Sequence, residues 1–213
     1  RGGKIGNSQI ADFGCGCGLM LEELSRFGHV VGMDFSQEAL DYCSEIPDVE
    51  LYQNNLAHKR QEFTDRFDFG VALDVLEHIE SDVTALKNMR SYMKEGGYCI
   101  LTVPANPWMW SKHDENCMHY RRYSRKQFRQ VIERAGFKVD FISYYNSFLF
   151  FPAAVVRIIS NIFDVDKDSS IENKQGNPLM NSILYRIFFL EGVFLEKGVH
   201  FPAGVSLIAK VYS

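Results

Sequence analysis

Three glycines at alternate positions, Gly14, Gly16 and Gly18, stand between a short apolar run and a helical pattern. Glycines in such a place let the backbone turn sharply and approach a ligand closely, because no Cβ is in the way. The helix that follows offers unpaired N–H groups and a partial positive charge to a carboxylate or a phosphate. A strand, a glycine loop and a helix in this order predict the opening unit of a sheet that binds a nucleoside-containing ligand.

The first 140 residues continue this alternation of apolar runs and helical patterns. The expected strands are 8–13, 29–34, 49–53, 67–73, 98–103 and 138–144, and the expected helices are 19–26, 37–44, 82–93 and 124–135. Such alternation with short connections is typical of a parallel sheet covered by helices on both faces. Because the ligand of such a sheet lies at the carboxyl ends of the strands, we expect one crevice to gather the glycine loop, Asp34, Asn55, Asp74 and the segment after Val103.

Composition limits the classes of protein that this chain can belong to. With 213 residues, 46% of them hydrophobic and 23% charged, residues 1–213 suit a single folded domain. A net charge of −4 argues against a nucleic-acid partner. Five scattered cysteines without paired CxxC clusters are typical of a reduced, cytoplasmic protein. No apolar run is long enough for a transmembrane span, and since the chain does not begin with Met, we expect residue 1 to be an internal boundary.

Two acidic residues refine the ligand. Asp34 lies 20 residues after Gly14, where a carboxylate accepts hydrogen bonds from ribose hydroxyls. Asp12 precedes the loop, and the third glycine is Gly18 with Leu19 after it, unlike the dinucleotide pattern GxGxxG. A buried carboxylate at position 12 would repel a pyrophosphate but could hold a cationic amino group. The expected ligand is therefore a nucleoside that carries an amino acid, which disfavours an NAD-dependent oxidoreductase.

Four motifs extend this pattern along the chain: DFGCGCG, VVGMDFS, FDFGVALDVLEHI and EGGYCILTVP. In this order they resemble the class I S-adenosylmethionine-dependent methyltransferases over about residues 9–145. LDVLEHI and the later HYRRYS…AGF resemble the small-molecule enzymes of a large bacterial group related to ubiquinone and polysaccharide pathways. The resemblance implies a doubly wound, seven-stranded Rossmann-like sheet whose last strand is antiparallel, and we expect residues 204–212 to form that strand.

The resemblance also implies S-adenosylmethionine as methyl donor, S-adenosylhomocysteine as product, and a small-molecule or lipid- or sugar-linked acceptor. Carried over by motif position, the implied cofactor site comprises Asp12, Gly14, Cys15, Gly16, Gly18, Asp34, Phe35, Asn55, Leu56, Leu73 and Asp74. Within this set Asp34 would bind the ribose, and Phe35 would lie beside the adenine. Asn55 stands where the family usually has an acid, but its amide can still hydrogen-bond the adenine amino group. An alternative with the same motifs is a catalytically inactive S-adenosylmethionine-binding interaction module.

Residues 104–123, PANPWMWSKHDENCMHYRRY, have no clear period, and a loop of this length in a compact domain is usually functional. It follows the fifth expected strand, so we expect it to form the acceptor site. If the acceptor is a hydroxyl, a general base is needed, and His119 and His113 are the candidates, with Asp114 to orient one of them. Adjacent Asp114 and Glu115 are a poor ligand set by themselves, so no metal is expected.

Further residues of this region are candidates for contact with the acceptor: Trp110, Arg121, Arg122, Tyr123 and Tyr145. The aromatic members would wall the pocket. The two arginines would meet either an anionic group of the substrate or a local carboxylate such as Asp114. The acceptor is therefore expected to be anionic or apolar.

Residues 147–196 form two apolar helical stretches, 147–163 and 179–196, around a polar loop. We interpret them as a helical C-terminal insertion before the final strand, which serves as a lid over the site. Two other interpretations stay open. The apolar faces could make peripheral contact with a membrane, or they could pair two subunits in a homodimer.

Overall fold

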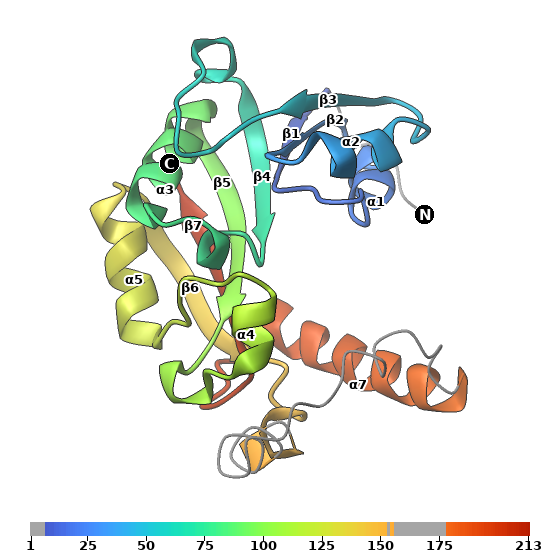
Figure 1. Cartoon of the computed structure of the whole chain (residues 1–213), viewed down its shortest axis with the longest axis vertical. Helices are drawn as coiled ribbons and strands as arrows, with labels where there is room; N and C mark the ends of the chain where they lie inside the picture. The colour runs from blue at the N-terminus through green and yellow to red at the C-terminus, as the bar shows by residue number, and fades with distance from the viewer. Residues whose placement is uncertain (1–6, 153, 156–177) are drawn as a thin grey trace.

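The computed structural model describes residues 7–152, 154–155 and 178–213 (Figure 1). Seven strands form one sheet in the order β3-β2-β1-β4-β5-β7-β6. Their bounds are β1 Gln9–Phe13, β2 His29–Asp34, β3 Val49–Gln53, β4 Phe67–Leu73, β5 Met93–Pro104, β6 Lys138–Tyr145 and β7 Ser206–Tyr212. β1 to β5 pair in parallel, whereas β7 pairs antiparallel with both β5 and β6. The expected doubly wound sheet with an antiparallel last strand is confirmed.

Short helices connect the strands. The α-helices are α1 Leu21–Ser25, α2 Gln37–Cys43, α3 Asp82–Tyr92, α4 Lys112–Asn116, α5 Arg125–Arg134 and α7 Pro178–Glu196, and the 3-10 turns are η1 Gln61–Phe63, η2 Leu76–His78 and η3 Pro107–Met109. The caps explain several bounds. Ser36 Oγ accepts a hydrogen bond from Ala39 N at the start of α2, and Ser124 and Gln127 form a reciprocal capping box at the start of α5.

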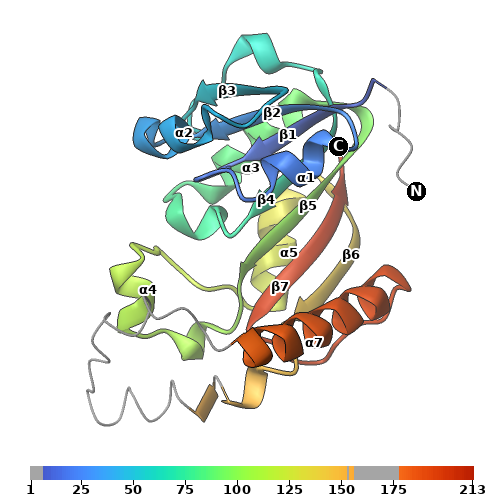
Figure 2. The same cartoon turned by 90° about the vertical axis from the view of Figure 1, so that its right-hand side faces the viewer.

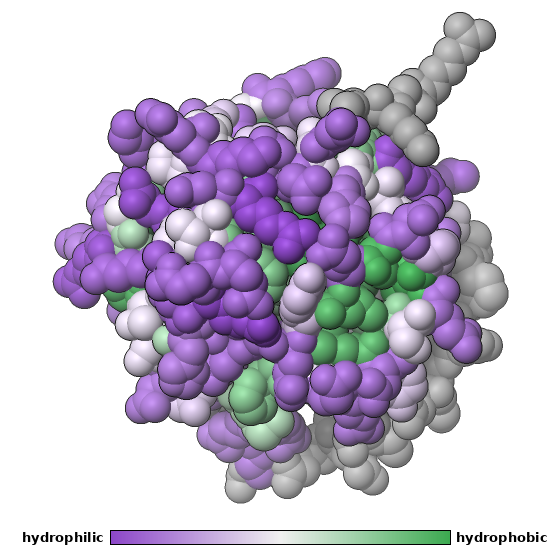
Figure 3. All heavy atoms as spheres, turned by 90° about the horizontal axis from the view of Figure 1, so that it is seen from above, coloured by the Kyte–Doolittle hydropathy of each residue, from purple (hydrophilic) through white to green (hydrophobic). Residues whose placement is uncertain are grey.

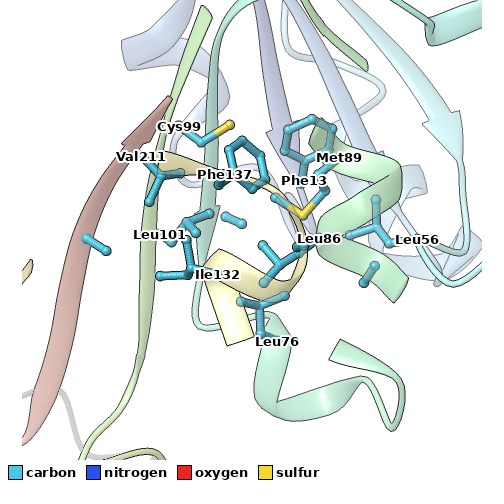
Figure 4. Packing of buried hydrophobic residues seen from close by; sticks show 14 of the residues in the cluster. Phe13, Leu56, Leu76, Leu86, Met89, Cys99, Leu101, Ile132, Phe137 and Val211 are labelled. Carbon is cyan, nitrogen blue, oxygen red and sulfur yellow. The ribbon is translucent and has the colours of Figure 1, made fainter. Parts of the chain in front are cut away.

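Two hydrophobic layers hold the helices to the sheet. The larger layer lies between the sheet and helices α3 and α5, where Phe13, Leu86, Met89 and Leu101 are fully buried (Figure 4). A smaller layer packs α1 and α2 against the opposite face, as the two perpendicular views show (Figures 1 and 2). Neighbouring residues of β1 point to opposite faces of the sheet: Ile10 belongs to the smaller hydrophobic layer, and Ala11 belongs to the larger one. Burial on both sides is what a doubly wound sheet requires.

Three local expectations were wrong. β5 begins at Met93 rather than at residue 98, because Gly96, with φ +75°, lies within the strand, where its pairing with β4 is irregular, and not in a preceding turn. α1 is shorter than 19–26, since the N–H of Leu21 donates to Gly18 O and residues 19 and 20 belong to the turn. Residues 104–123 contain η3 and α4, elements too short to show a period in the sequence.

The carboxyl ends of the parallel strands and the beginning of β7 meet at one edge of the sheet. The glycine loop, η2, α4 and the segment after β6 all lie along this edge, and α7 extends away from the sheet beside it (Figures 1 and 2). The helical stretch expected at 179–196 is confirmed by α7. Of the other expected stretch and the polar loop, residues 153 and 156–177 lie outside the described residues.

The end of the molecule opposite the carboxyl edge of the sheet has a mostly polar surface. Seen from above, it is covered mainly by hydrophilic residues with a hydrophobic patch beside the centre (Figure 3). An open hollow there is lined by charged side chains such as Glu95, Lys138 and Asp140, at the amino-terminal end of β6. It is remote from the edge at which ligands of such sheets bind. No helix among the described residues is both long and apolar enough to cross a bilayer.

Candidate active site

The glycine loop turns against the end of β2. The N–H groups of Gly14 and Cys15 both donate to Met33 O, at 2.6 and 3.0 Å. Gly14, Gly16 and Gly18 all have positive φ, a conformation that side chains strain. A Cβ on Gly14 would lie 2.5 Å from Val75, whereas a Cβ on Gly16 would meet no atom within 4 Å. The backbone at Gly16 therefore borders open space in which a ligand can approach it closely.

Two carboxylates stand beside this loop. Asp34 accepts hydrogen bonds from Gly16 N at 2.9 Å and from Ser36 N at 2.8 Å, one on each oxygen. A carboxylate has about four acceptor positions, so both oxygens can still accept from ribose hydroxyls. Asp12 is buried in β1, and burial, helped by the negative charge of Asp34, raises its pKa to about 7. A cationic amino group is a partner that would return Asp12 to its ionised form.

The residues expected at the adenine differ in what they can offer. The Phe35 side chain is 71% exposed beside Asp34, so its ring is available for stacking. Asn55 is exposed, and its Oδ1 accepts from Ala57 N at 2.9 Å, with a second lone pair left over. The Leu56 side chain instead packs into the larger core layer (Figure 4).

The other buried members of the expected cofactor set lie in and after β1 and β4. Cys15 is buried in the smaller layer, and burial raises the pKa of its thiol. Leu73, at the end of β4, is half-buried against the same layer. The Cys15 thiol and the Leu73 side chain add no charge to the expected cofactor site, so Asp12 and Asp34 supply the charged groups beside the glycine loop.

Asp74 follows β4 with a left-handed backbone, φ +54°. Its N–H donates to Thr102 Oγ1 at 3.0 Å, and that hydroxyl donates back to Asp74 Oδ1 at 3.2 Å. Burial raises the pKa of Asp74, opposed by the Thr102 hydrogen bond and the charges of His119 and Arg122. Tyr145, at the end of β6, has its pKa raised to about 12, first by burial and then by the charge of Asp74.

Asp114 is the centre of the 104–123 region. It is fully buried, and it accepts from Arg122 Nε at 2.7 Å and from His119 Nδ1 at 3.1 Å through Oδ1, while Oδ2 accepts from Ser111 N at 3.0 Å. Arg122 also donates to Ala105 O at 3.0 Å. The histidine that Asp114 hydrogen-bonds here is His119. Of the two partners expected for Arg122, a substrate anion or a carboxylate of the chain, the structure shows the second, Asp114.

His119 lies against η2. Its ring contacts that of His78 edge to face, with centroids 4.7 Å apart and an interplanar angle of 83°. Burial lowers the pKa of His78, helped by the charge of His119 and opposed by that of Asp34. Burial also raises the pKa of Glu77 to about 8. These residues bring the two halves of the site together.

The remaining candidates, Arg121 and Tyr123, have other partners. Arg121 is held by Asp82, with Nη1 to Oδ2 at 2.9 Å, and its Nη2 donates to Glu80 O. Tyr123 is 2% exposed in the larger core layer, and its hydroxyl donates to Asp82 Oδ2 at 2.8 Å. The expectation that Tyr123 walls a pocket does not match this burial.

Two exposed or half-exposed candidates sit on or near α4. His113 is exposed, with Nε2 3.8 Å from Cys117 Sγ. Trp110 Nε1 donates to Glu115 Oε1 at 3.3 Å. Both side chains therefore contact neighbours on their own segment.

Sequence reasoning missed three residues of this edge: Glu77, Thr102 and Glu191. Glu191, on α7, is 2% exposed and accepts from Ser147 N at 2.9 Å. Thr102 shows no signal in the sequence, since it occupies an ordinary strand position. Glu77 did carry a signal in the sequence. It is an acidic residue close to Val75, Leu76 and Ile79, and such apolar neighbours predict burial.

A family model described as a methyltransferase domain matches residues 6–140. The chain is 28% identical over 106 residues to the ubiquinone biosynthesis O-methyltransferase of Shewanella pealeana, covering 47% of this chain and 45% of that protein. The chain spans about half the length of the curated relatives that it matches.

Solved structures share the fold. An S-adenosylmethionine-dependent methyltransferase from Mesorhizobium loti has a TM-score of 0.63 and 12% identity, covering 99% of this chain and 93% of that one. A second, from Archaeoglobus fulgidus, has a TM-score of 0.61 and 14% identity, covering 99% and 88%. The open backbone at Gly16, the free positions on Asp34 and the buried Asp12 fit S-adenosylmethionine. Because the family model matches more than half of this chain, the chain belongs to the family of S-adenosylmethionine-dependent methyltransferases.

Proposed function

We propose that this protein transfers the methyl group of S-adenosylmethionine to an oxygen of a small-molecule acceptor, either free or linked to a lipid or a sugar. The observation that carries the proposal is the position of the His119–Asp114 pair. It lies at the same sheet edge as the glycine loop, and the His119 ring contacts His78 of η2, the turn that follows β4. Oxygen is the acceptor atom named for the curated relatives as well.

The cofactor half binds and orients the donor. Asp34 would hold the ribose, Gly16 would let the backbone approach the methionine part, and Asp12 would pair with its ammonium. Bound S-adenosylmethionine supplies an electrophilic methyl group on a sulfonium. Because the leaving group is neutral, the protein mainly has to align the two reactants and exclude water.

The acceptor half handles the proton that a hydroxyl must lose. Asp114 engages Nδ1 of His119 and fixes its tautomer, so Nε2 is the nitrogen that can face the acceptor. Asp74 and Tyr145 would position the acceptor beside the methyl group, since Asp74 directly follows β4, the strand that pairs with β1 before the glycine loop. Because Asp114 hydrogen-bonds His119, we favour His119 over His113 as the base.

The charge and polarity of the region favour an acceptor with an apolar part. Arg121 and Arg122 are both held by carboxylates of the chain, which leaves an anionic acceptor without these partners. Directly after β6, Phe148 is 55% and Phe151 is 74% exposed. Such side chains could cover an apolar acceptor, a membrane surface or a second subunit, and we favour the acceptor because they follow Tyr145. Five free cysteines support a cytoplasmic setting.

The proposal is tested by measuring S-adenosylhomocysteine formation with a panel of phenols, sugars and polyprenyl-linked compounds. We expect turnover with at least one hydroxyl acceptor and a product heavier by one methyl group in mass spectrometry. Binding of S-adenosylmethionine without turnover on any member would favour the inactive binding module. His119→Gln should lower kcat with unchanged cofactor affinity, and His58→Gln, an exposed histidine on another loop, should change neither.

A further inference from the structure

Three potential metal ligands converge beside the acceptor side of the site. Glu77 and His78 come from η2, and His119 comes from the segment after α4. One ligand atom of each residue lies within 4.8 Å of the others. Metal–ligand bonds of about 2.1 Å place neighbouring ligand atoms roughly 3–4 Å apart, so small rotations of these side chains are enough to close around an ion.

Glu77 supplies an observation that points to a ligand. Its side chain is 1% exposed, and its Oε2 has no hydrogen-bond partner among the described residues. A buried carboxylate oxygen without a partner is costly, and native structures pair such groups or place them on a cation. The carboxyl groups of Asp74 and Asp114 disfavour the ionised form of Glu77, and Arg122 opposes them, so a bound cation would relieve this repulsion.

Outer contacts orient both imidazoles. Asp114 engages Nδ1 of His119 at 3.1 Å, and the backbone of Cys117 hydrogen-bonds the His78 ring. Metal-binding histidines in proteins usually give their second nitrogen to a carboxylate or a backbone carbonyl, which fixes the tautomer and the ring plane. Each histidine therefore keeps one nitrogen for an ion.

We infer that Glu77, His78 and His119 form a binding site for one divalent transition-metal cation, with Zn²⁺ the best match. Two imidazole nitrogens and one carboxylate oxygen are a ligand set for Zn²⁺ and its first-row neighbours, whereas Mg²⁺ and Ca²⁺ favour oxygen ligands. Three protein ligands leave a coordination position open, as in catalytic zinc sites. The expectation of no metal considered Asp114 and Glu115, and Asp114 belongs to the outer contacts of this site rather than to its ligands.

The open position gives the ion a role that rests on the proposed function. An acceptor hydroxyl bound to the ion has a lowered pKa, so its proton leaves readily to solvent. His119 then acts as a ligand through Nε2, and the ion takes over the activation of the oxygen. The chemical class of acceptor that suits such a site is a phenol or another hydroxyl compound that can offer an oxygen to the metal.

The test is a metal titration of the tag-free, chelator-treated protein in the absence of S-adenosylmethionine and acceptor. Zn²⁺ binding is followed by calorimetry, and Co²⁺ binding is followed by its visible absorption. We expect one ion per chain for the wild type and for His58→Gln. Affinity should fall at least about 100-fold in Glu77→Gln, His78→Gln and His119→Gln, since each loses one of three ligands.

Separate measurements keep folding and function apart from metal binding. Calorimetry with S-adenosylmethionine and a melting curve show that each variant is folded, and His119→Gln decides the case if Glu77→Gln fails to fold. No stoichiometric binding by a folded wild type, equal binding by all variants, or a thiolate–Co²⁺ charge-transfer band would overturn the metal site. Metal binding without turnover on any acceptor counts against the proposed function alone, and full turnover by the metal-free enzyme overturns the role of the ion.

Discussion

The two halves of this site are built in different ways. The cofactor half is local: the loop at residues 14–18 bonds to the end of the next strand, where Asp34 binds the same loop. The acceptor half joins distant parts of the chain, since His78 meets His119 and Tyr145 approaches Thr102. A site built from residues close in sequence can be recognised from a short motif. A site built from residues far apart in sequence cannot.

Their polar contacts differ as well. In the cofactor half, backbone N–H groups of the loop are hydrogen-bonded, and the carboxylate Asp34 is only half-buried. In the acceptor half, a fully buried carboxylate, Asp114, binds a guanidinium and an imidazole. We therefore expect changes in the acceptor half to act first on stability, and changes in the cofactor half to act first on binding.

The largest expected effect is that of Asp114→Asn on stability. It leaves the Arg122 guanidinium, whose side chain is 3% exposed, without its anion, and loss of one partner of a buried pair costs about 3–5 kcal/mol. We expect the melting temperature to fall by about 10 °C. The exposed neighbour variant Glu115→Gln should change the free energy of unfolding by less than about 0.5 kcal/mol. An equal, small shift in both variants would show that the pair does not hold this segment.

The next effect, on binding, should come from Asp34→Ala. It removes the acceptor for the ribose hydroxyls and the hydrogen bonds that hold Gly16 and Ser36. Calorimetry should show a loss of S-adenosylmethionine affinity of at least about 100-fold, equal to about 2.8 kcal/mol. Asp41→Ala, on the exposed side of α2, is the control and should bind normally. Retained affinity in Asp34→Ala would mean that the ribose is held elsewhere.

A smaller effect follows from the raised pKa of Asp12, about 7. Ionised Asp12 attracts the cofactor ammonium, so below this pKa binding must first release a proton, and affinity should fall about tenfold from pH 7.0 to 5.5. The ammonium stays charged throughout this range. Asp12→Asn should bind more weakly at pH 7.0 and show no such slope. An unchanged slope in the variant would assign the titration to another group.

The same pKa has the opposite consequence for the unliganded protein. The folded state holds the Asp12 proton more tightly than the unfolded chain does, because its pKa is raised above the ordinary value. This contribution to the free energy of unfolding is present at low pH and is lost as the pH rises through about 7. Added S-adenosylmethionine should therefore raise the melting temperature more at neutral than at acidic pH.

The motifs predicted, for a physical reason, that the glycine loop and Asp34 lie together at one edge of the sheet. A strand, a glycine turn and a helix are contiguous, so spacing alone places Gly16 and Asp34 at one edge. The seven-stranded sheet and its antiparallel last strand were implied by the resemblance, and the structure confirms them. The start of β5 was wrong because Gly96 reads as a turn in sequence but lies in an irregular strand.

The acceptor half was only partly predictable. Polar residues in 104–123 indicated a functional segment, but which histidine Asp114 binds depends on how the chain folds back after α4. The arginines were expected at either a substrate anion or a local carboxylate such as Asp114, and spacing could not decide between these partners or predict the pairing of Arg121 with Asp82. Thr102 sits in a strand like any other residue, and only the register of β4 with β5 brings it to Asp74.

The smallest expected effect tests whether the acceptor half extends to β6. Tyr145→Phe removes one buried hydroxyl near Asp74, and a hydrogen bond of about 1 kcal/mol corresponds to a roughly fivefold rise in the acceptor KM. Cofactor affinity should stay the same, because Tyr145 lies at the far side of β7 from the glycine loop. Tyr144→Phe, at the neighbouring position that packs against the larger core layer, is the matched control and should leave the acceptor KM unchanged. If Tyr145→Phe instead weakened the cofactor and spared the acceptor, the division of the site into a local and a distant half would be wrong at β6.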